Sequence, residues 1–303
     1  MPGGAATVMA VLRATLESMS AELVGFGAAG AVVAAHLAHL ERLRKRPGTI
    51  YQRRRALARL ARFSGQRALL DLQLEDLRAF TERAELATET VAAETNHLVA
   101  FYRWALLEGL ISQDPTVRLE RPQRKKLLPR PMPDEDVEVA LTRSEDPIRA
   151  WLHLAAYAGL RACEIAPLRG EDVRGDVIVI REQKGGDPGS VPLAPQLRST
   201  FARLPRRGWL FPAGDDPSRP VSAGQVSRRT NRWLHEVGID STLHTLRHWY
   251  GTNLLRATGN LRVVQELMRH ETIQSTVGYT ALVGDQAASA LEQLPEVGRL
   301  RVV

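Results

Sequence analysis

The residues best able to do chemistry lie near the end of the chain, between positions 242 and 279. His244 and Arg247 are three residues apart, which places both on one face if this stretch is helical. The guanidinium of Arg247 offers a planar fork of donors that matches two phosphate oxygens. His270 and Tyr279 follow with a spacing of nine. Because nearby positive charge favours a phenolate, we expect a lowered pKa for Tyr279 and predict a phosphate site beside an aromatic nucleophile.

Two upstream segments contain residues that would complete such a site. Arg161 and Glu164 again have a spacing of three, directly after an apolar stretch over 147–159 that predicts a helix. Lys184 lies in a Gly-rich turn between a β-branched run over 176–181 and a second short run. This pattern predicts a β-hairpin with the lysine near its tip.

The order and spacing of these residues resemble the signature of the tyrosine recombinases, also called the phage integrase family. That signature is an Arg followed by an acid, a Lys in a hairpin, an HxxR motif, a second His, and a Tyr nine residues beyond it. The resemblance is strong over 150–281 and weak over 31–120. One position departs from it. Arg269 stands where the family usually has Gly, and we expect its side chain to contact phosphate or to point to solvent.

The resemblance implies one catalytic constellation of six residues: Arg161, Lys184, His244, Arg247, His270 and Tyr279. The two arginines would clamp the scissile phosphate, and Tyr279 would attack phosphorus with His244 as its base. Lys184 would protonate the departing 5′ oxygen, and His270 would donate to a phosphate oxygen. Glu164 would orient its neighbours. Because the 3′-phosphotyrosyl ester keeps the energy of the broken bond, we expect no ATP, cofactor or metal.

Two other residues deserve comparison as nucleophiles. Tyr250 is close to the HxxR motif, but it falls in an apolar run over 249–255 and is interpreted as a packing residue, so Tyr279 is preferred. Cys163 is the single cysteine of the chain, which excludes an internal disulfide and a multi-cysteine zinc site. We expect it to be a small buried residue.

Composition indicates a polyanionic partner. The chain has 41 Lys and Arg against 34 Asp and Glu, which gives a formal net charge of +7. Residues 1–30 are rich in Ala and Gly and are expected to be a flexible N-terminal segment. Residues 23–40 carry no formal charge, but their glycines and two histidines argue against a membrane span. With no basic region ahead of them, a signal peptide is not expected, and we predict a cytoplasmic, nucleoid-associated protein.

An all-helical unit is predicted over 31–120, which resembles the core-binding (SAM-like) domain of the family. The stretch 42–62 contains nine Arg or Lys and no acid, and is expected to face phosphates. Pro47 and Gly48 would end one helix, and Thr49 would cap the next. A basic, Pro-rich linker is expected over 121–133.

The second unit, 134–303, is expected to be the catalytic domain. The predicted fold class is therefore mainly α with a small antiparallel β-sheet, an α+β catalytic domain behind a helical one. A helix over 222–237 would lie near or in the major groove. The candidate DNA contacts are Arg44, Lys45, Arg46, Thr49, Arg53, Arg54, Arg124, Lys125, Lys126, Arg228, Arg229 and Arg232.

The resemblance also implies partners and a function. Double-stranded DNA would be bound by a homo-tetramer on paired recombination sites, with accessory directionality or bending factors as further partners. A terminal helix over 285–294 would dock on a neighbouring protomer or pack in cis. The predicted function is integration or excision of phage or mobile-element DNA. The alternatives are a chromosome-dimer resolving recombinase, a type IB topoisomerase-like relaxing enzyme, and a non-catalytic DNA-binding protein.

Overall fold

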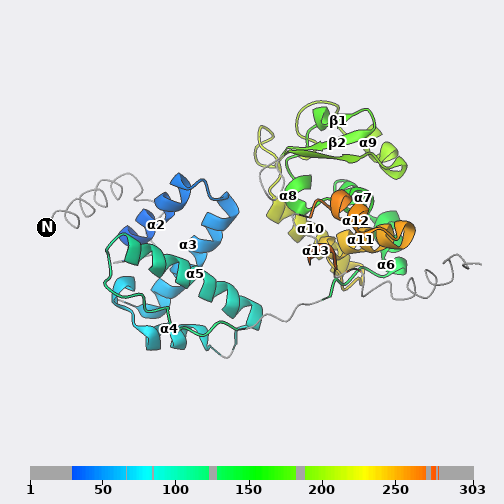
Figure 1. Cartoon of the computed structure of the whole chain (residues 1–303). Coiled ribbons are helices and arrows are strands. Elements are labelled where there is room, and N and C mark those ends of the chain that lie inside the picture. Colours follow the sequence, from blue (N-terminus) through cyan, green and yellow to red (C-terminus); the bar gives the residue numbers. More distant parts are fainter. Residues whose placement is uncertain are drawn as a thin grey trace, which may run out of the picture. The chain divides into compact units, whose positions relative to one another are not determined.

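The computed structural model describes residues 29–65, 67–83, 85–122, 128–181, 188–270, 274–277 and 279. The chain divides into two compact units, Met1–Lys126 and Leu127–Val303, which are described separately (Figure 1). The division falls inside the segment 121–133 that was expected to be a linker. Lys184, Arg124, Lys125, Lys126 and the helix predicted over 285–294 lie outside the described residues. None of the helices in the described ranges is long and apolar enough to cross a membrane.

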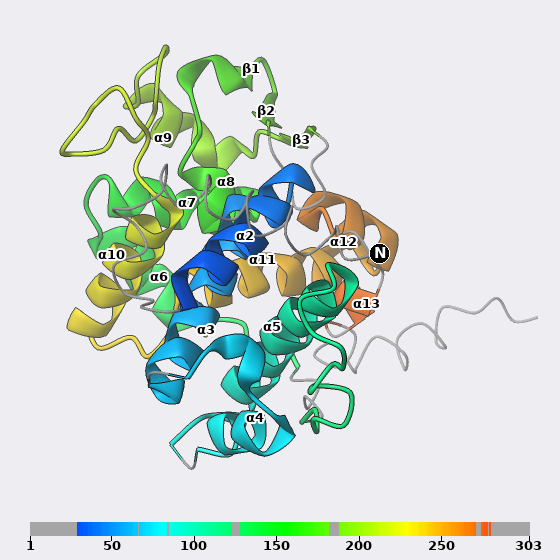
Figure 2. The ribbon, with the colours of Figure 1, turned by 90° about the vertical axis from the view of Figure 1, so that its left-hand side faces the viewer.

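The N-terminal unit is a helical bundle. Its helices are α2 (Gly30–Arg42), α3 (Pro47–Ser64), α4 (Leu74–Thr81) and α5 (Thr88–Leu107), with the short 3₁₀ turn η2 (Leu69–Asp71) between α3 and α4. Figure 2 shows α3 and α5 of this bundle, and the two helices pack against each other. Phe101 and Trp104 of α5 are buried in its core, as predicted.

The start of α3 differs from the prediction. This helix begins at Pro47, and Arg46 precedes it as the N-cap residue without a side-chain capping bond. Proline suits the first position of a helix because its φ is already helical and its missing N–H would have no partner there. The prediction that Thr49 caps this helix is therefore wrong, since Thr49 lies in its first turn.

Arg53 does not fit the predicted phosphate-facing surface. Its side chain is turned into the bundle, where Nε donates to Nδ1 of His97 at 3.1 Å and Nη1 donates to the His97 carbonyl at 2.9 Å. Nη1 also lies 3.3 Å from Nε2 of His36. Arg53 is 7% exposed, so it is a buried structural residue and not a candidate DNA contact. Burial lowers the pKa of Arg53 to about 10, which leaves it charged at neutral pH.

The C-terminal unit combines helices with one small sheet. The helices are α6 (Asp134–Arg143), α7 (Ile148–Ala158), α8 (Ala162–Ile165), α9 (Arg198–Ala202), α10 (Ala223–Glu236), α11 (Leu243–Thr258), α12 (Leu261–Met268) and α13 (Gln274–Val277), with 3₁₀ turns η3 (Gly170–Asp172) and η4 (Pro195–Leu197). The apolar helix α7 packs against α11 and α10, and its Trp151 and Leu154 are buried in the main core of this unit. This arrangement, together with the sheet, confirms the predicted fold class.

The sheet has three antiparallel strands in the order β1 (Val173–Arg174), β2 (Val177–Ile180) and β3 (Gly189–Pro192). Strands β2 and β3 are the predicted hairpin, in which Ile178 pairs with Val191 and Ile180 pairs with Gly189. Ile178, Ile180 and Val191 are buried, which fixes the register because a slip by one residue would expose them. Sequence periodicity did not predict β1, because two residues are too few to show an alternation.

The Arg53 cluster predicts that acid destabilises the N-terminal unit. Burial first, and then the charge of Arg53, lower the pKa of His36 to about 3, and the same causes lower that of His97 to about 4. In the unfolded chain these histidines titrate near pH ~6.5. Lowering the pH from about 6.5 toward 4 therefore adds protons to the unfolded state alone, so the free energy of unfolding falls, by about 1 kcal/mol per pH unit for His36.

Urea denaturation of the full chain at several pH values measures this effect. The variant His36→Gln should lose part of the acid sensitivity. The control is His235→Gln, because His235 is exposed on α10 in the other unit and is not part of the Arg53 cluster. A stability that is flat between pH 7 and 5 would contradict the assignment.

Candidate active site

The turn between α7 and α8 positions Arg161 and Glu164. Helix α7 ends at Gly159, which has a left-handed φ of +59°. A Cβ at this position would lie 2.4 Å from a ring atom of Tyr250, so both the backbone and the packing require glycine. Arg161 is then the N-cap residue of α8, and its backbone N–H donates to Oε2 of Glu164 at 2.9 Å. This hydrogen bond holds the Glu164 carboxylate at the N-terminus of α8.

Glu164 is the point where three guanidiniums meet. Its Oε1 accepts from Nη1 of Arg161 at 2.8 Å, its Oε2 accepts from Nη2 of Arg269 at 2.8 Å, and Nη1 of Arg247 lies 3.7 Å from Oε2. Glu164 is 2% exposed. Burial raises its pKa, but Arg269, the Arg161 amide and Arg247 outweigh burial and hold the pKa below its usual range. Glu164 is therefore ionised at neutral pH and leaves the cluster with two net positive charges, three guanidiniums less one carboxylate.

Arg247 is one of the largest fully buried side chains of the described residues, with 1% exposure. It comes from the second turn of α11, and its Nη1 and Nη2 donate to the carbonyl oxygens of Gly159 and Met268. These bonds tie α11 to the end of α7 and to the end of α12. Burial, followed by the charge of Arg161, lowers the pKa of Arg247 to about 9, which still leaves it charged at neutral pH.

Arg269 does not point to solvent, so that expectation for it was wrong, while its contact with a phosphate stays a prediction. It ends α12 with a left-handed φ of +53°, a conformation that glycine adopts most easily. Its side chain turns inward and is 4% exposed. Besides Glu164, its guanidinium donates to the carbonyl oxygens of Leu267 at 2.9 Å and Gly159 at 3.2 Å. The charge gained by Arg at this position thus belongs to the buried arginine cluster.

Tyr279 is almost completely buried, with 1% exposure. Its ring lies against Gly251 of α11, where an added Cβ would come within 2.9 Å of a ring atom. It also stacks on the ring of His270, with centroids 6.3 Å apart and planes 19° apart. The expected lowering of its pKa is wrong for the free protein. Burial raises the pKa of Tyr279 to about 12, and the opposing charges of Arg247 and Arg161 are too weak to reverse this.

Two histidines, His270 and His248, contact this tyrosine, and a third, His244, contacts His248. Nδ1 of His270 lies 2.9 Å from the hydroxyl of Thr276, and burial followed by Arg247 lowers the His270 pKa to about 3. His244 keeps part of its surface exposed, and its ring contacts the ring of His248 edge-on at 4.5 Å. The hydroxyl of Tyr279 lies 2.8 Å from Nδ1 of His248.

His248 was missed by the sequence reasoning. A signal was present, because His248 is four residues after His244 and the two side chains therefore share one face of α11. Attention to the HxxR motif alone assigned the role of base to His244. Among the described residues, the imidazole within hydrogen-bond distance of the Tyr279 hydroxyl is that of His248.

The structure thus brings together Arg161, Arg247, His244, His270 and Tyr279 around Glu164 and His248. Tyr250 packs beside Gly159, in agreement with its interpretation as a packing residue. Cys163 is exposed on α8, so the expectation that it is buried was wrong. A four-residue helix has room for few inward positions, and Glu164 and Ile165 occupy them.

The remaining candidate DNA contacts are mostly exposed. Arg44, Lys45, Arg46 and Thr49 are exposed around the start of α3, and Arg54 is partly buried. Arg228, Arg229 and Arg232 are exposed on α10, where the Arg229 guanidinium also lies 5.2 Å from the ring centroid of Trp151. Arg59, which belongs to the same basic run as Arg53, pairs with the buried Glu94 of α5. The basic run over 42–62 contains no acid of its own, but Glu94 of α5 provides a carboxylate that pairs with it.

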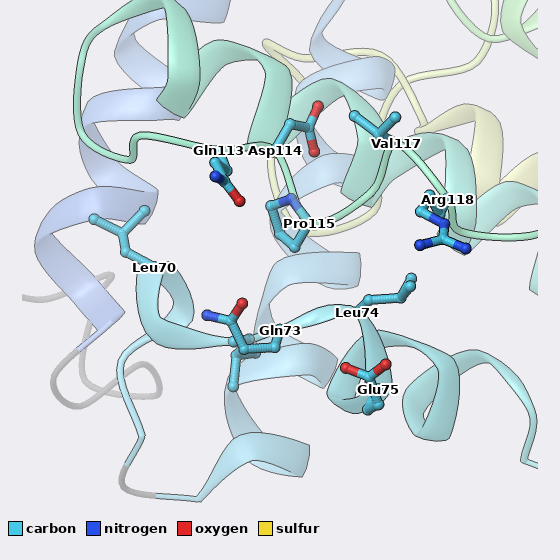
Figure 3. Close-up of a pocket in the computed structure, with 10 residues that line it drawn as sticks. Leu70, Gln73, Leu74, Glu75, Gln113, Asp114, Pro115, Val117 and Arg118 are labelled. Carbon is cyan, nitrogen blue, oxygen red and sulfur yellow. The ribbon is translucent and has the colours of Figure 1, made fainter.

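A pocket of about 490 Å³ lies in the N-terminal unit (Figure 3). Leu70, Gln73, Leu74 and Glu75 line one side of it, and the segment from Gln113 to Arg118 lines the other. Glu75 and Asp114 give its polar lining two carboxylates against the single guanidinium of Arg118. This charge does not suit a phosphate, and none of the five predicted catalytic residues that the structure describes lines the pocket.

Comparison with known proteins gives a consistent result. Residues 131–284 match the family model described as the phage integrase family. The tyrosine recombinase XerD of Pseudomonas aeruginosa is 34% identical over 203 residues, which cover 60% of this chain and 67% of that protein. XerC of Vibrio vulnificus is 30% identical over 232 residues, covering 70% of this chain and 72% of that one. A lambda integrase dimer bound to a COC′ core site matches with a TM-score of 0.67 at 17% identity, over 82% of this chain and 76% of that one, and shows the likeness of fold.

The arginine cluster predicts a large stability cost for Glu164→Gln. The substitution would leave the buried charges of Arg247 and Arg269 without a carboxylate, and breaking a buried pair in this way costs about 3–5 kcal/mol. Denaturant unfolding of the C-terminal unit measures the loss. The matched control is Glu266→Gln, because Glu266 forms an exposed pair with Arg262 and should cost less than about 1 kcal/mol. Equal effects of the two substitutions would contradict the central role of Glu164.

Proposed function

The chain belongs to the phage integrase family of tyrosine-type site-specific recombinases, and we propose that it cuts and rejoins double-stranded DNA through a 3′-phosphotyrosyl intermediate on Tyr279. The observation that carries this proposal is the convergence of Tyr279, His270 and the arginine cluster on one place in the C-terminal unit. Arg247 and Arg161 lie close enough to Tyr279 for their charges to oppose the rise of its pKa. The same charges would favour a phosphate beside the tyrosine.

The arginine cluster would bind the scissile phosphate. Arg161 is the more accessible guanidinium, with 21% of its side chain exposed, so it is best placed to contact a non-bridging oxygen. Arg247 gives two N–H groups to backbone carbonyls, and its charge acts on Tyr279 from within the buried cluster. The two net positive charges around Glu164 match the charge that develops as a phenol oxygen adds to a phosphodiester. This charge would be worth most in a buried site, where water screens it least.

The remaining roles follow from the chemistry. Tyr279 would attack phosphorus, and the bond to the 5′ oxygen would break, leaving a phosphotyrosyl ester at the 3′ end and a free 5′-hydroxyl. Lys184 of the hairpin would give the 5′ oxygen its proton. His270 would donate from Nε2 to a phosphate oxygen while its Nδ1 pairs with Thr276. Because the ester conserves the energy of the broken bond, the strand exchange needs no nucleotide hydrolysis.

The proposed biological role is integration and excision of phage or mobile-element DNA by a homo-tetramer on paired sites. A lambda integrase structure described as a tetramer bound to a Holliday junction has the same fold, with a TM-score of 0.64 at 17% identity. The relatives at 30–34% identity are named XerC and XerD and not integrases, which makes chromosome-dimer resolution the second candidate role. Excision junctions in the cell would support the first role, and an accumulation of chromosome dimers on deletion would support the second.

A suicide duplex tests the reaction itself. A binding site is first selected from random-sequence duplexes, and a nick near its centre then traps the covalent adduct. We expect an adduct with the wild-type chain and none with Tyr279→Phe, because the phenyl ring lacks the attacking oxygen. Tyr250→Phe is the matched control and should keep the adduct. An adduct that survives in Tyr279→Phe and disappears in Tyr250→Phe would assign the nucleophile to Tyr250.

The exposed basic residues at the start of α3 predict a salt-dependent contribution to DNA binding. Replacing a residue that contacts phosphate should lower the slope of log K against log[salt] by about 1, with little change in sequence preference. We expect this for Lys45→Gln and Arg44→Gln in titrations of the full chain with duplex DNA. Arg219→Gln is the control, because Arg219 already pairs with Asp215 and Asp216. An unchanged slope in the first two variants would remove these residues from the interface.

A further inference from the structure

His248 is placed on the reacting oxygen of the proposed nucleophile. Its Nδ1 lies 2.8 Å from the hydroxyl of Tyr279, within hydrogen-bond distance. His248 directly follows Arg247, whose guanidinium is held by the carbonyls of Gly159 and Met268. One turn along α11, Gly251 leaves room for the tyrosine ring. Helix α11 therefore supplies the phosphate-binding guanidinium, the imidazole and the space for the phenol.

The two other histidines are less suited to the hydroxyl. Nδ1 of His270 is paired with Thr276, and its ring lies parallel to the tyrosine ring and not end-on to the hydroxyl. His244 contacts the ring of His248 at 4.5 Å. We propose that His248 is a further catalytic residue, which accepts the proton of the Tyr279 hydroxyl as that oxygen attacks phosphorus. This inference rests on the proposed function of Tyr279.

The surroundings of His248 keep it in the form that accepts a proton. The groups that face it are His244 and Arg247 from its own helix and Tyr279 and His270 from the segment after α12. Burial, followed by His244 and Arg247, lowers the pKa of His248 to about 4 in the free protein, so the imidazole is neutral at pH 7. A neutral ring with its proton on Nε2 presents the lone pair of Nδ1 to the hydroxyl. A bound phosphate anion would offset Arg247 and raise the affinity of His248 for the proton.

The proton balance of the cleavage step is complete. The O–H bond of Tyr279 breaks and its proton moves to Nδ1 of His248, while the phenol oxygen forms a bond to phosphorus. The bond between phosphorus and the 5′ oxygen breaks, and Lys184 gives that oxygen a proton. The products are the phosphotyrosyl ester, a free 5′-hydroxyl, an imidazolium at His248 and a neutral amine at Lys184. Religation reverses both transfers.

Single-turnover cleavage of the nicked suicide duplex tests this role. His248→Ala should slow adduct formation by roughly 10²-fold or more, in the range of a general base. His248→Asn can keep an acceptor oxygen near the position of Nδ1 but cannot take the proton, so it should be slow as well. A duplex with sulfur at the scissile 5′ bridging position separates the two ends of the reaction. Sulfur leaves without protonation, so it should rescue Lys184→Ala but neither His248 variant.

A second measurement does not depend on DNA. In ¹⁵N-labelled full chain, the Nδ1 resonance of His248 should report an unprotonated nitrogen that accepts a hydrogen bond. Tyr279→Phe should shift this resonance. His153 is the matched control, because its Nδ1 lies 2.9 Å from the hydroxyl of Thr200 elsewhere in the same unit. Its resonance should not move, and His153→Ala should leave the rate of adduct formation unchanged.

The outcomes separate this inference from the proposed function. An adduct that requires Tyr279 but forms at the wild-type rate in His248→Ala would overturn the role of His248 and leave the function intact. A faster reaction in His248→Ala would show that the contact holds Tyr279 in an unreactive position. A wild-type rate in His248→Asn would show that His248 positions the tyrosine without taking its proton. Both results overturn the proposal. If the wild-type chain forms no adduct, the proposed function fails and the inference falls with it.

Discussion

The ionised carboxylate of Glu164 is the interaction on which the catalytic unit depends. It allows Arg161, Arg247 and Arg269 to lie within one buried volume, where three unpaired guanidiniums would repel one another. The same contacts join the turn after α7, the second turn of α11 and the end of α12. The contacts of Glu164 therefore hold the helices together and also fix the positions of the three positive charges.

The cluster of Arg161, Arg247, Arg269 and Glu164 has an excess of positive charge. A cluster with no net charge would be easier to bury but would not attract an anion. Here the excess is held by backbone carbonyls of Gly159, Leu267 and Met268, which are dipoles and not charges. Under the proposed function, such a site would bind a phosphate through this excess charge. It is arranged before the ligand arrives, which is the condition for electrostatic stabilisation of a transition state.

Much of this could be predicted from sequence, because catalytic spacing and apolar periodicity are local properties. The hairpin, the helical units and the grouping of Arg161 with Glu164 followed from neighbouring residues. The errors arose where distant segments decide the outcome. The buried state of Arg53 depends on His36 and His97 from two other helices, and the inward turn of Arg269 depends on Glu164. The contact of His248 with Tyr279 spans 31 residues, and the raised pKa of that tyrosine reflects burial that no local pattern reveals.

The burial of Tyr279 has a consequence for the proposed nucleophile of the free protein. A phenol with 1% exposure and a pKa of about 12 contains almost no phenolate at neutral pH and is closed to electrophiles and modifying enzymes. As the proposed nucleophile, Tyr279 would therefore react poorly with a phosphodiester that the free chain meets by diffusion. Under the proposed function, reactivity would be a property of the complex with DNA, in which the bound phosphate would offset the charge of Arg247 and raise the proton affinity of His248. The resting structure would thereby limit nicking at unintended sites.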